Sequence, residues 1–262
     1  MAELLFWPTL LAYGEAAVAY FGDARSPGVA GRFATWGVRI GWLVQTALLA
    51  VQAVRSDGFP WSTWAASLNL FVWLVVGAYL IWGCQTRYRL LGLAVLPVAA
   101  VLLAVAHAGG GTAAHGASRY SNLFLVLHVG LVLVAFAGFT LAAALSGLYL
   151  WQERRLKRRE TSILRVRAPG LARLDELSAR TIAVALPALT LGIVVGIVRL
   201  RERGGGIDAL IVVTLLTWCV YGGYVVLRFG AGLRGRRAAY VVLLGFLLVA
   251  VARLALPMTH FS

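Results

Sequence analysis

The stretch LHVGLVLVAFAGFTLAAALSGLYLWQERRLKRR, residues 127–159, decides the fold. No charged residue interrupts it from residue 127 to residue 152, and five Lys or Arg residues then follow among residues 154–159. A hydrocarbon core about 30 Å thick needs roughly 20 apolar residues of helix. Basic residues at one end of such a run are typical of the cytoplasmic side of a membrane. The stretch therefore predicts a membrane-spanning helix with its basic end inside.

The rest of the chain repeats this pattern. Of its 262 residues, 61% are hydrophobic and 13% are charged, and the mean hydropathy is +0.83. A soluble domain of this length cannot bury so much apolar surface. We therefore predict an all-α polytopic membrane protein, a single integral membrane domain over residues 1–262. About eight spanning helices are expected, at residues 4–22, 33–54, 63–84, 90–108, 122–150, 181–200, 208–228 and 238–257.

The net charge of +14 indicates membrane topology rather than nucleic-acid binding. Basic residues cluster in alternate connections, at residues 87–89, 151–180 and 228–237. The positive-inside rule places those connections in the cytoplasm. Eight spans with these connections inside put both termini on the outer side of the plasma or inner membrane.

The inner connection 151–180 contains APGLARLDELSAR, in which Leu171, Leu174 and Leu177 recur at three-residue spacing. Charged residues alternate with these leucines. The pattern favours a short amphipathic helix that lies on the inner membrane surface. The alternative is a docking face for a cytoplasmic partner.

Four histidines all fall on the predicted outer side. His107 ends the fourth apolar stretch and His115 lies in the following connection, and both fit ordinary solvated residues. His128 lies inside the fifth stretch, six residues after Asn122, or about 9 Å along a helix. His260 follows the eighth stretch. A histidine within a membrane segment indicates a functional site, and its ring nitrogens are common metal ligands.

Arginines and tryptophans accompany the histidines on that side. Outer arginines either hold an anion through paired hydrogen bonds or contact lipid headgroups. Trp61 and Trp64 fit a flat apolar wall or an ordinary aromatic belt. Axial nitrogens, anion-binding guanidinium groups and a flat wall are together what haem requires. The outer arginines are Arg55, Arg119, Arg199, Arg201, Arg203 and Arg253.

Two opposite charges fall within the first two apolar stretches, at matching depth. They are Glu15 and Arg39. An unpaired charge at the centre of a spanning helix costs about 2.5–3.5 kcal/mol on insertion scales. We expect either an ion pair between the two side chains or snorkelling of Arg39 to the inner interface.

Residues 127–159 resemble the central segment of the CcsA/HemX-type cytochrome c assembly proteins. The resemblance continues through APGLARLDELSAR, residues 217–246 and the terminal THFS (259–262). It implies a polytopic protein that handles haem at the outer face, with His128 and His260 as the axial ligands. The family's loop before the penultimate helix pairs tryptophans with an aspartate. Here RERGGGIDALIV (201–212) keeps the glycines and Asp208, which is similar to the HemX-like branch, whose members lack the tryptophan-rich motif.

The leading hypothesis is a haem-binding and transfer protein for cytochrome c assembly or haem delivery, a role in which the protein makes no new covalent bond itself. It would hold non-covalent b-type haem between the two histidines. Arginines near residue 200 would bind the propionates, and Asp208 would orient a ligand or an arginine. The expected cofactor-binding residues are His128, His260, Asp208, Arg199, Arg201, Arg203, Trp61 and Trp64, with the two histidines ligating the iron.

Two other hypotheses stay open. The HemX-like resemblance implies a membrane regulator of glutamyl-tRNA reductase and tetrapyrrole synthesis, acting through loop 151–180. A transporter of non-haem metal or a small molecule would use the four histidines, but few polar groups lie at the predicted midplane. The expected partners are haem, the lipid bilayer, and either other cytochrome c assembly proteins or a cytoplasmic haem-synthesis enzyme. Nucleic acid is not expected.

Overall fold

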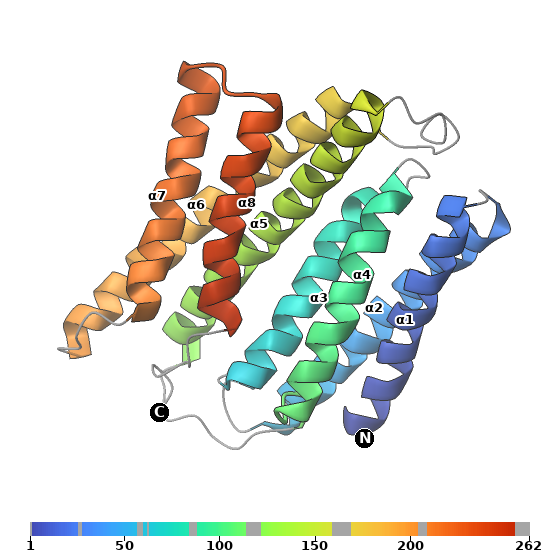
Figure 1. The fold of residues 1–262 in the computed structure, drawn as a ribbon. Coiled ribbons are helices and arrows are strands. Elements are labelled where there is room, and N and C mark those ends of the chain that lie inside the picture. The colour runs from blue at the N-terminus through green and yellow to red at the C-terminus, as the bar shows by residue number, and fades with distance from the viewer. Residues whose placement is uncertain are drawn as a thin grey trace. The chain divides into compact units, whose positions relative to one another are not determined.

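A computed structural model describes residues 2–25, 28–56, 60–61, 63–83, 88–113, 122–158, 169–203 and 209–254. Within these ranges all regular structure is helical (Figure 1). Seven of the helices are long and apolar enough to cross a membrane, which confirms an all-α polytopic membrane protein. The helices are α1 (Ala2–Arg25), α2 (Val29–Arg55), α3 (Trp64–Gly83), α4 (Arg89–Ala108), α5 (Asn122–Lys157), α6 (Leu171–Arg203), α7 (Ala209–Gly230) and α8 (Gly235–Leu254).

The helices form two compact units. The first comprises residues 1–120 with residues 155–169, and the second comprises residues 121–154 with residues 170–262. Helices α1 to α4 build the first unit, and most of α5 with α6 to α8 builds the second. The grouping of all eight helices into a single membrane domain stays a prediction.

Helices α1 to α4 pack in a ring, with α1 against α2 and α4, and α3 against α2 and α4. Glycines allow the close approach, as is usual between helices in membranes. A Cβ on Gly41 would lie 2.8 Å from the ring of Tyr13, and one on Gly92 would lie 2.6 Å from the ring of Tyr20. Both tyrosines are buried, so the glycines of one helix receive the large side chains of its neighbour.

A chain of buried amides connects the core of the first unit to the turn after α4. The Tyr13 hydroxyl donates to Gln45 Oε1 at 2.7 Å, and Gln45 Nε2 donates to Asn69 Oδ1 at 2.9 Å. Asn69 Nδ2 donates to Gln52 Oε1 at 3.2 Å, and Gln52 Nε2 donates to the Gly111 carbonyl at 2.9 Å. Polar groups inside a membrane protein must bond to one another because lipid offers no partner. The network therefore holds the turn after α4 against α2 and α3.

Helices α5 and α6 pack antiparallel along a seam of small residues. On α6 the contacting positions recur every seven residues, a spacing that keeps one face of a helix against its neighbour. A Cβ on Gly138 or on Gly192 would come within 2.8 Å or 2.9 Å of the opposite side chain. The contacts of the α5–α6 seam are Ser178 with Ser146, Ala185 with Gly138, and Gly192 with Val132.

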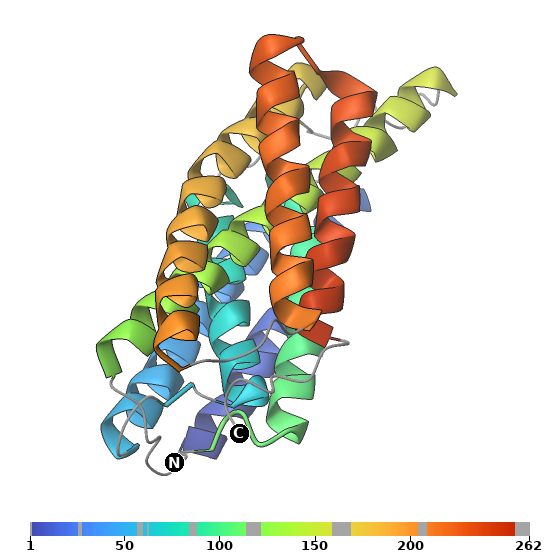
Figure 2. The same ribbon diagram turned by 90° about the vertical axis from the view of Figure 1, so that its left-hand side faces the viewer.

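Helices α7 and α8 lie side by side in both views (Figure 1, Figure 2).

The segment expected to form a separate interfacial helix is the beginning of α6. This helix runs unbroken from Leu171 to Arg203, and Leu174 and Leu177 are fully buried. The interfacial-helix prediction is wrong because the leucine stripe packs into the second unit and not against lipid. The opposite side of these turns is polar, and there Glu176 accepts a hydrogen bond from Arg180.

A buried ion pair ties the beginning of α6 to the α7–α8 turn. Arg228 Nη1 lies 2.8 Å from Asp175 Oδ2, and the two side chains are 11% and 12% exposed. Asp175 Oδ1 also accepts the backbone N–H of Gly235 at 3.1 Å. Gly235 has a φ of +68°, which glycine adopts without steric cost. One carboxylate therefore joins three helices at this end of the unit.

The expected ion pair between Glu15 and Arg39 does not form, although the structure describes both residues. The Arg39 guanidinium lies 5.1 Å from the centre of the Trp36 ring, and Glu15 is exposed. The reason is the rotation of α2. Gly37 and Gly41 face α1. Arg39, two positions from each, points about 160° away from them, because each residue turns the helix by about 100°.

Candidate functional site

His128 lies near the beginning of α5 and is half-buried. Its Nδ1 lies 2.8 Å from the carbonyl oxygen of Gly192 on α6. Because a carbonyl can only accept, Nδ1 carries a proton, and the neutral ring keeps its lone pair on Nε2. Metal-ligating histidines are typically held in this way, with the second ring nitrogen donating to a carbonyl or carboxylate. The ring therefore has the tautomer and the fixed orientation that a metal ligand needs.

A second glycine of α6, Gly196, leaves the space in which the His128 ring lies against that helix. A Cβ on Gly196 would lie 2.7 Å from His128 Cε1 and 3.0 Å from its Nδ1. Gly196 follows Gly192 by one helical turn, so the two glycines leave a strip of bare backbone for the imidazole. Our sequence analysis missed this strip. The available signal was GIVVG (192–196), two glycines four residues apart in an apolar helix, a spacing typical of close helix contacts.

The predicted propionate ligands lie on the same helix, a few residues beyond this strip. Arg199, Arg201 and Arg203 belong to the last turns of α6, and the structure describes their backbone. Because Gly196 contacts His128, the fold brings this end of α6 to the histidine. Three further predicted or considered residues lie outside the described part of the chain: His115, Asp208 and His260.

Trp61 and Trp64 belong to the first unit. Trp64 begins α3, and its ring would lie 3.4 Å from a Cβ on Gly109 in the turn after α4. Trp61 is half-buried in the segment before α3. The two tryptophans are thus part of the same end of the first unit as that turn. Their role as a wall for a ligand of His128 stays a prediction.

His107 is a packed residue rather than the solvated one that the sequence suggested. Its Nδ1 lies 2.7 Å from Thr112 Oγ1. Its ring stacks on Phe6 of α1, with centroids 3.7 Å apart and planes 10° from parallel, and Trp7 packs edge-on at 6.0 Å. Stacked aromatic contacts of this kind hold neighbouring helices together. His107 therefore joins α4 to α1.

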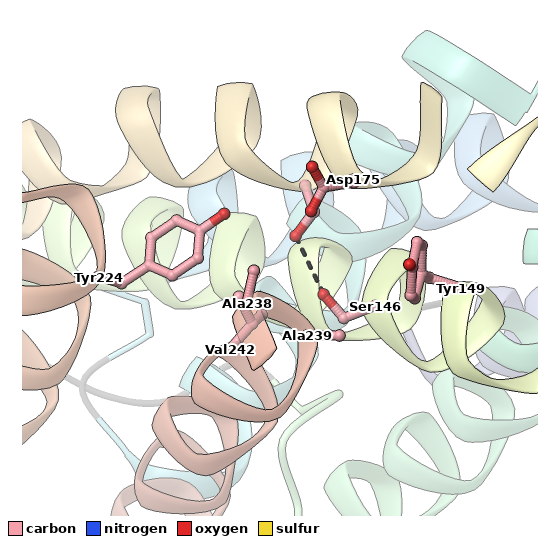
Figure 3. A pocket seen from close by; sticks show the side chains of 8 residues that line it. Ser146, Tyr149, Asp175, Tyr224, Ala238, Ala239 and Val242 are labelled. Carbon is pink, nitrogen blue, oxygen red and sulfur yellow. Dashed lines mark hydrogen bonds between the residues drawn. The ribbon is translucent and has the colours of Figure 1, made fainter. Parts of the chain in front are cut away.

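A polar recess at the inner end of the second unit is not a ligand site (Figure 3). The hydroxyls of Ser146 and Ser178 lie 3.1 Å apart and bond to each other, and Asp175 is engaged by Arg228. The space between these groups is too narrow for a water molecule. The recess is lined by Ser146, Tyr149, Asp175, Ser178, Tyr224, Ala238, Ala239 and Val242.

His128 is therefore the strongest candidate for a functional residue. Among the residues that the structure describes, no three His, Cys, Asp or Glu side chains gather into a set that could hold a metal ion. A metal-containing group at His128 would be held by this side chain of α5 together with residues of other segments. The fold and this site define a polytopic helical membrane protein in which His128 of α5 is held against the backbone of α6.

The sequence matches the family of cytochrome c assembly proteins over residues 61–259, and the chain belongs to this family. The matched range includes α5, α6 and the contact between His128 and the two glycines. It is the second unit, together with α3 and α4 of the first, that carries the family's pattern.

Curated relatives cover most or all of the chain. Protein HemX of Brevibacillus brevis is 27% identical over 270 residues, which span 100% of this chain and 98% of the relative. Cytochrome c biogenesis protein CcsA of Prochlorococcus marinus (strain MIT 9303) is 29% identical over 241 residues, which span 80% and 76%. Protein HemX of Bacillus subtilis (strain 168) is 24% identical over 238 residues, which span 88% and 86%. No solved structure matches the chain significantly.

Proposed function

We propose that this protein handles haem during cytochrome c assembly and holds it near the outer membrane face through His128. The observation that carries the proposal is the 2.8 Å contact between His128 Nδ1 and the Gly192 carbonyl, which leaves Nε2 as the ligand atom. Membership in the cytochrome c assembly family supports haem as the bound group. The relatives named CcsA and HemX support a role in this process within a membrane.

The residues around the site suit non-covalent b-type haem. The neutral imidazole of His128 would supply one nitrogen ligand to the iron, and His260 is proposed to supply the second. The arginines at 199, 201 and 203 follow Gly196 on α6 and would bind the propionates by charge-assisted hydrogen bonds. Asp208 would orient one of these groups, and Trp61 and Trp64 would contact the macrocycle. When bound, haem supplies the iron porphyrin that is delivered, while the protein binds and orients it.

Half-burial of His128 also suits a protein that transfers its ligand. A fully enclosed site would retain the haem, whereas a half-buried ring held against the α6 backbone would let the haem leave. The fixed ring loses little conformational entropy when a ligand binds, because its orientation is already set.

A second candidate function is regulation of tetrapyrrole synthesis, as in the HemX-like hypothesis. The specific observation in its favour is that the HemX relative of Brevibacillus brevis matches along the whole chain. The regulatory contact would lie at the predicted inner face, where Arg173 and Arg180, both within residues 151–180, are exposed on the beginning of α6. Capture of glutamyl-tRNA reductase from solution by the full-length protein, lost on deletion of residues 159–168, would favour this function.

Absorbance of the purified protein tests the haem proposal. We expect a low-spin Soret band that His128→Ala and His260→Ala each weaken or shift and that His115→Ala leaves unchanged. His107→Ala is a control for damage to the fold, since it should lower thermal stability without removing the band. A protein that binds no haem, even when haem is supplied during purification, would refute the proposal.

A further inference from the structure

Two opposite charges lie at one depth in the first unit. Glu15 is ten residues from Arg25, the inner end of α1 (25 − 15), and Arg39 is ten residues from Val29, the inner start of α2 (39 − 29). At 1.5 Å per residue both lie about 15 Å from those ends, near the middle of a hydrocarbon core about 30 Å thick. Both helices are candidate membrane spans. The two charges therefore lie where lipid solvates them least.

Both charges face away from the core of their unit. Glu15 is exposed and lies in a stripe of α1 with Leu11 and Val18, which are 61% and 73% exposed. Arg39 lies over Trp36, which is 60% exposed. Neither charge has an ion pair with any residue that the structure describes. The exposed stripe of α2 beside Arg39 comprises Phe33, Trp36, Ile40 and Leu43.

In the second unit, the acidic side chains of the described helices are confined to the helix ends. They all lie within five residues of a helix end, as the bounds of α5 and α6 show. Arg180, the described cation deepest in α6, already bonds with Glu176. The acidic residues concerned are Glu153, Asp175, Glu176 and Glu202.

The two charges lie on opposite flanks of the α2 stripe. On one flank is α1, which contacts Gly37 and Gly41 and carries Glu15. Arg39, about 160° from those glycines, lies on the other flank. The charges therefore cannot meet within one chain. A two-fold rotation about an axis through the α2 stripe and along the membrane normal exchanges the flanks, so that each Glu15 faces the Arg39 of a second copy.

We propose that the protein forms a two-fold symmetric dimer in which the outward stripe of α2 packs against the same stripe of a second copy. Two equivalent ion pairs between Glu15 of one copy and Arg39 of the other complete the interface. An isologous interface of this kind needs complementary groups at equal depth on either side of the axis. Equal depth and opposite flanks are what the first unit provides. The exposed aromatic and aliphatic side chains of the stripe then contact protein in place of lipid.

Disulfide cross-linking in intact membranes tests the interface directly. Cys84 and Cys219 are first replaced by Ser, and single cysteines are introduced as Trp36→Cys, Ile40→Cys and Leu43→Cys in separate variants. We expect at least one of these variants to give a covalent dimer on oxidation. Leu191→Cys on α6, at a position that is 56% exposed, is the matched control and should stay monomeric. Absence of a dimer from all three stripe variants would overturn the proposal.

A mixing experiment tests the ion pairs themselves. Two copies with different affinity tags are co-expressed, and capture of one tag measures dimers. A dimer of Glu15→Gln with itself keeps no ion pair, and neither does a dimer of Arg39→Gln with itself. A mixed dimer of the two variants keeps one pair. We therefore expect mixed capture to exceed either self-capture at least tenfold.

Two outcomes of the mixing experiment contradict the proposal. Mixed capture no stronger than self-capture would show that the charges do not pair between copies, as lipid-facing charges would not. Capture of a different membrane protein in place of the second copy would identify another occupant of the face. If the Gln variants fail to insert, the cross-linking of the otherwise native chain still decides. Haem content enters neither readout, so both stand independently of the proposed function.

Discussion

Both histidines that the structure describes, His107 and His128, make a hydrogen bond through Nδ1, but only one of the two partners fixes the position of the ring proton. His107 faces the Thr112 hydroxyl, which can donate or accept, so its tautomer is not set by that bond. His128 faces the Gly192 carbonyl, which can only accept. In the neutral ring of His128 this bond therefore places the proton on Nδ1. This difference of one partner atom separates a packing residue from a candidate ligand.

Substitution of Gly196 should disturb the site without touching the ligand itself. In Gly196→Ala the new Cβ would lie 2.7 Å from His128 Cε1, so the ring must shift and its bond to Gly192 must lengthen. We expect weaker haem binding, several-fold or more, with a shifted Soret band. Gly130→Ala on α5 is the control, because its Cβ would meet open space. Equal haem titrations for the two variants would show that Gly196 does not position the ring.

At the scale of elements, the second unit is held together by an ion pair at the end where α6 begins and by close packing between α5 and α6. The α5–α6 seam uses small residues, which let dispersion act between backbones in the absence of a hydrophobic driving force in lipid. The ion pair of Asp175 and Arg228 joins α6 to the α7–α8 turn. This ion pair is buried. The ion pairs of the next residue, Glu176, are on the surface, and their side chains are 43% exposed or more.

Removal of the Asp175 charge should destabilise the second unit strongly. Asp175→Asn leaves Arg228 buried without a counter-ion, and loss of one partner of a buried pair typically costs about 3–5 kcal/mol. We expect a lower midpoint of thermal unfolding in detergent for Asp175→Asn. Glu176→Gln breaks exposed pairs, which contribute little, and should leave the midpoint unchanged. An unchanged midpoint for Asp175→Asn would show that the pair does not hold the turn.

At the scale of the whole molecule, charge asymmetry organises the chain. In the second unit the bond between Asp175 and Gly235 brings the beginning of α6 to the α7–α8 turn, so the beginning of α6 and the basic segment 228–237 lie at one end. Segments of this composition stay on the cytoplasmic side of a membrane. The helix packing therefore places the beginning of α6 beside the basic α7–α8 turn, at the end that the positive-inside pattern predicts to be inside.

Tags at two sites test the topology. We expect a tag at Ser262 to be labelled from the outside of intact cells, because an even number of spans follows an outer N-terminus. A tag inserted at Arg158 should be labelled only after the membrane is opened, since it follows the basic end of α5. Labelling of both tags from the same side would mean that one span has been miscounted, and the outer position of His128 would then be wrong.

Composition and local pattern were sufficient to predict the class of the protein and its helices. Each of the eight expected apolar stretches coincides with a helix, because spanning length and hydrophobicity are properties of a continuous segment. The same reasoning singled out His128, since a polar ring in an apolar run is visible without a fold. The resemblance to cytochrome c assembly proteins, read from residues 127–159 and beyond, was confirmed by the family match.

Only the tertiary structure decided how those helices are rotated against one another. Rotation placed Leu174 and Leu177 in the core rather than on lipid, and turned Arg39 away from α1. It also set the His128 ring on the bare backbone of α6, which selects the tautomer. These features depend on which face of one helix meets a neighbour distant in sequence. Hydrophobicity along a segment specifies that a helix crosses the membrane, but small residues on its partners determine the face that it turns toward them.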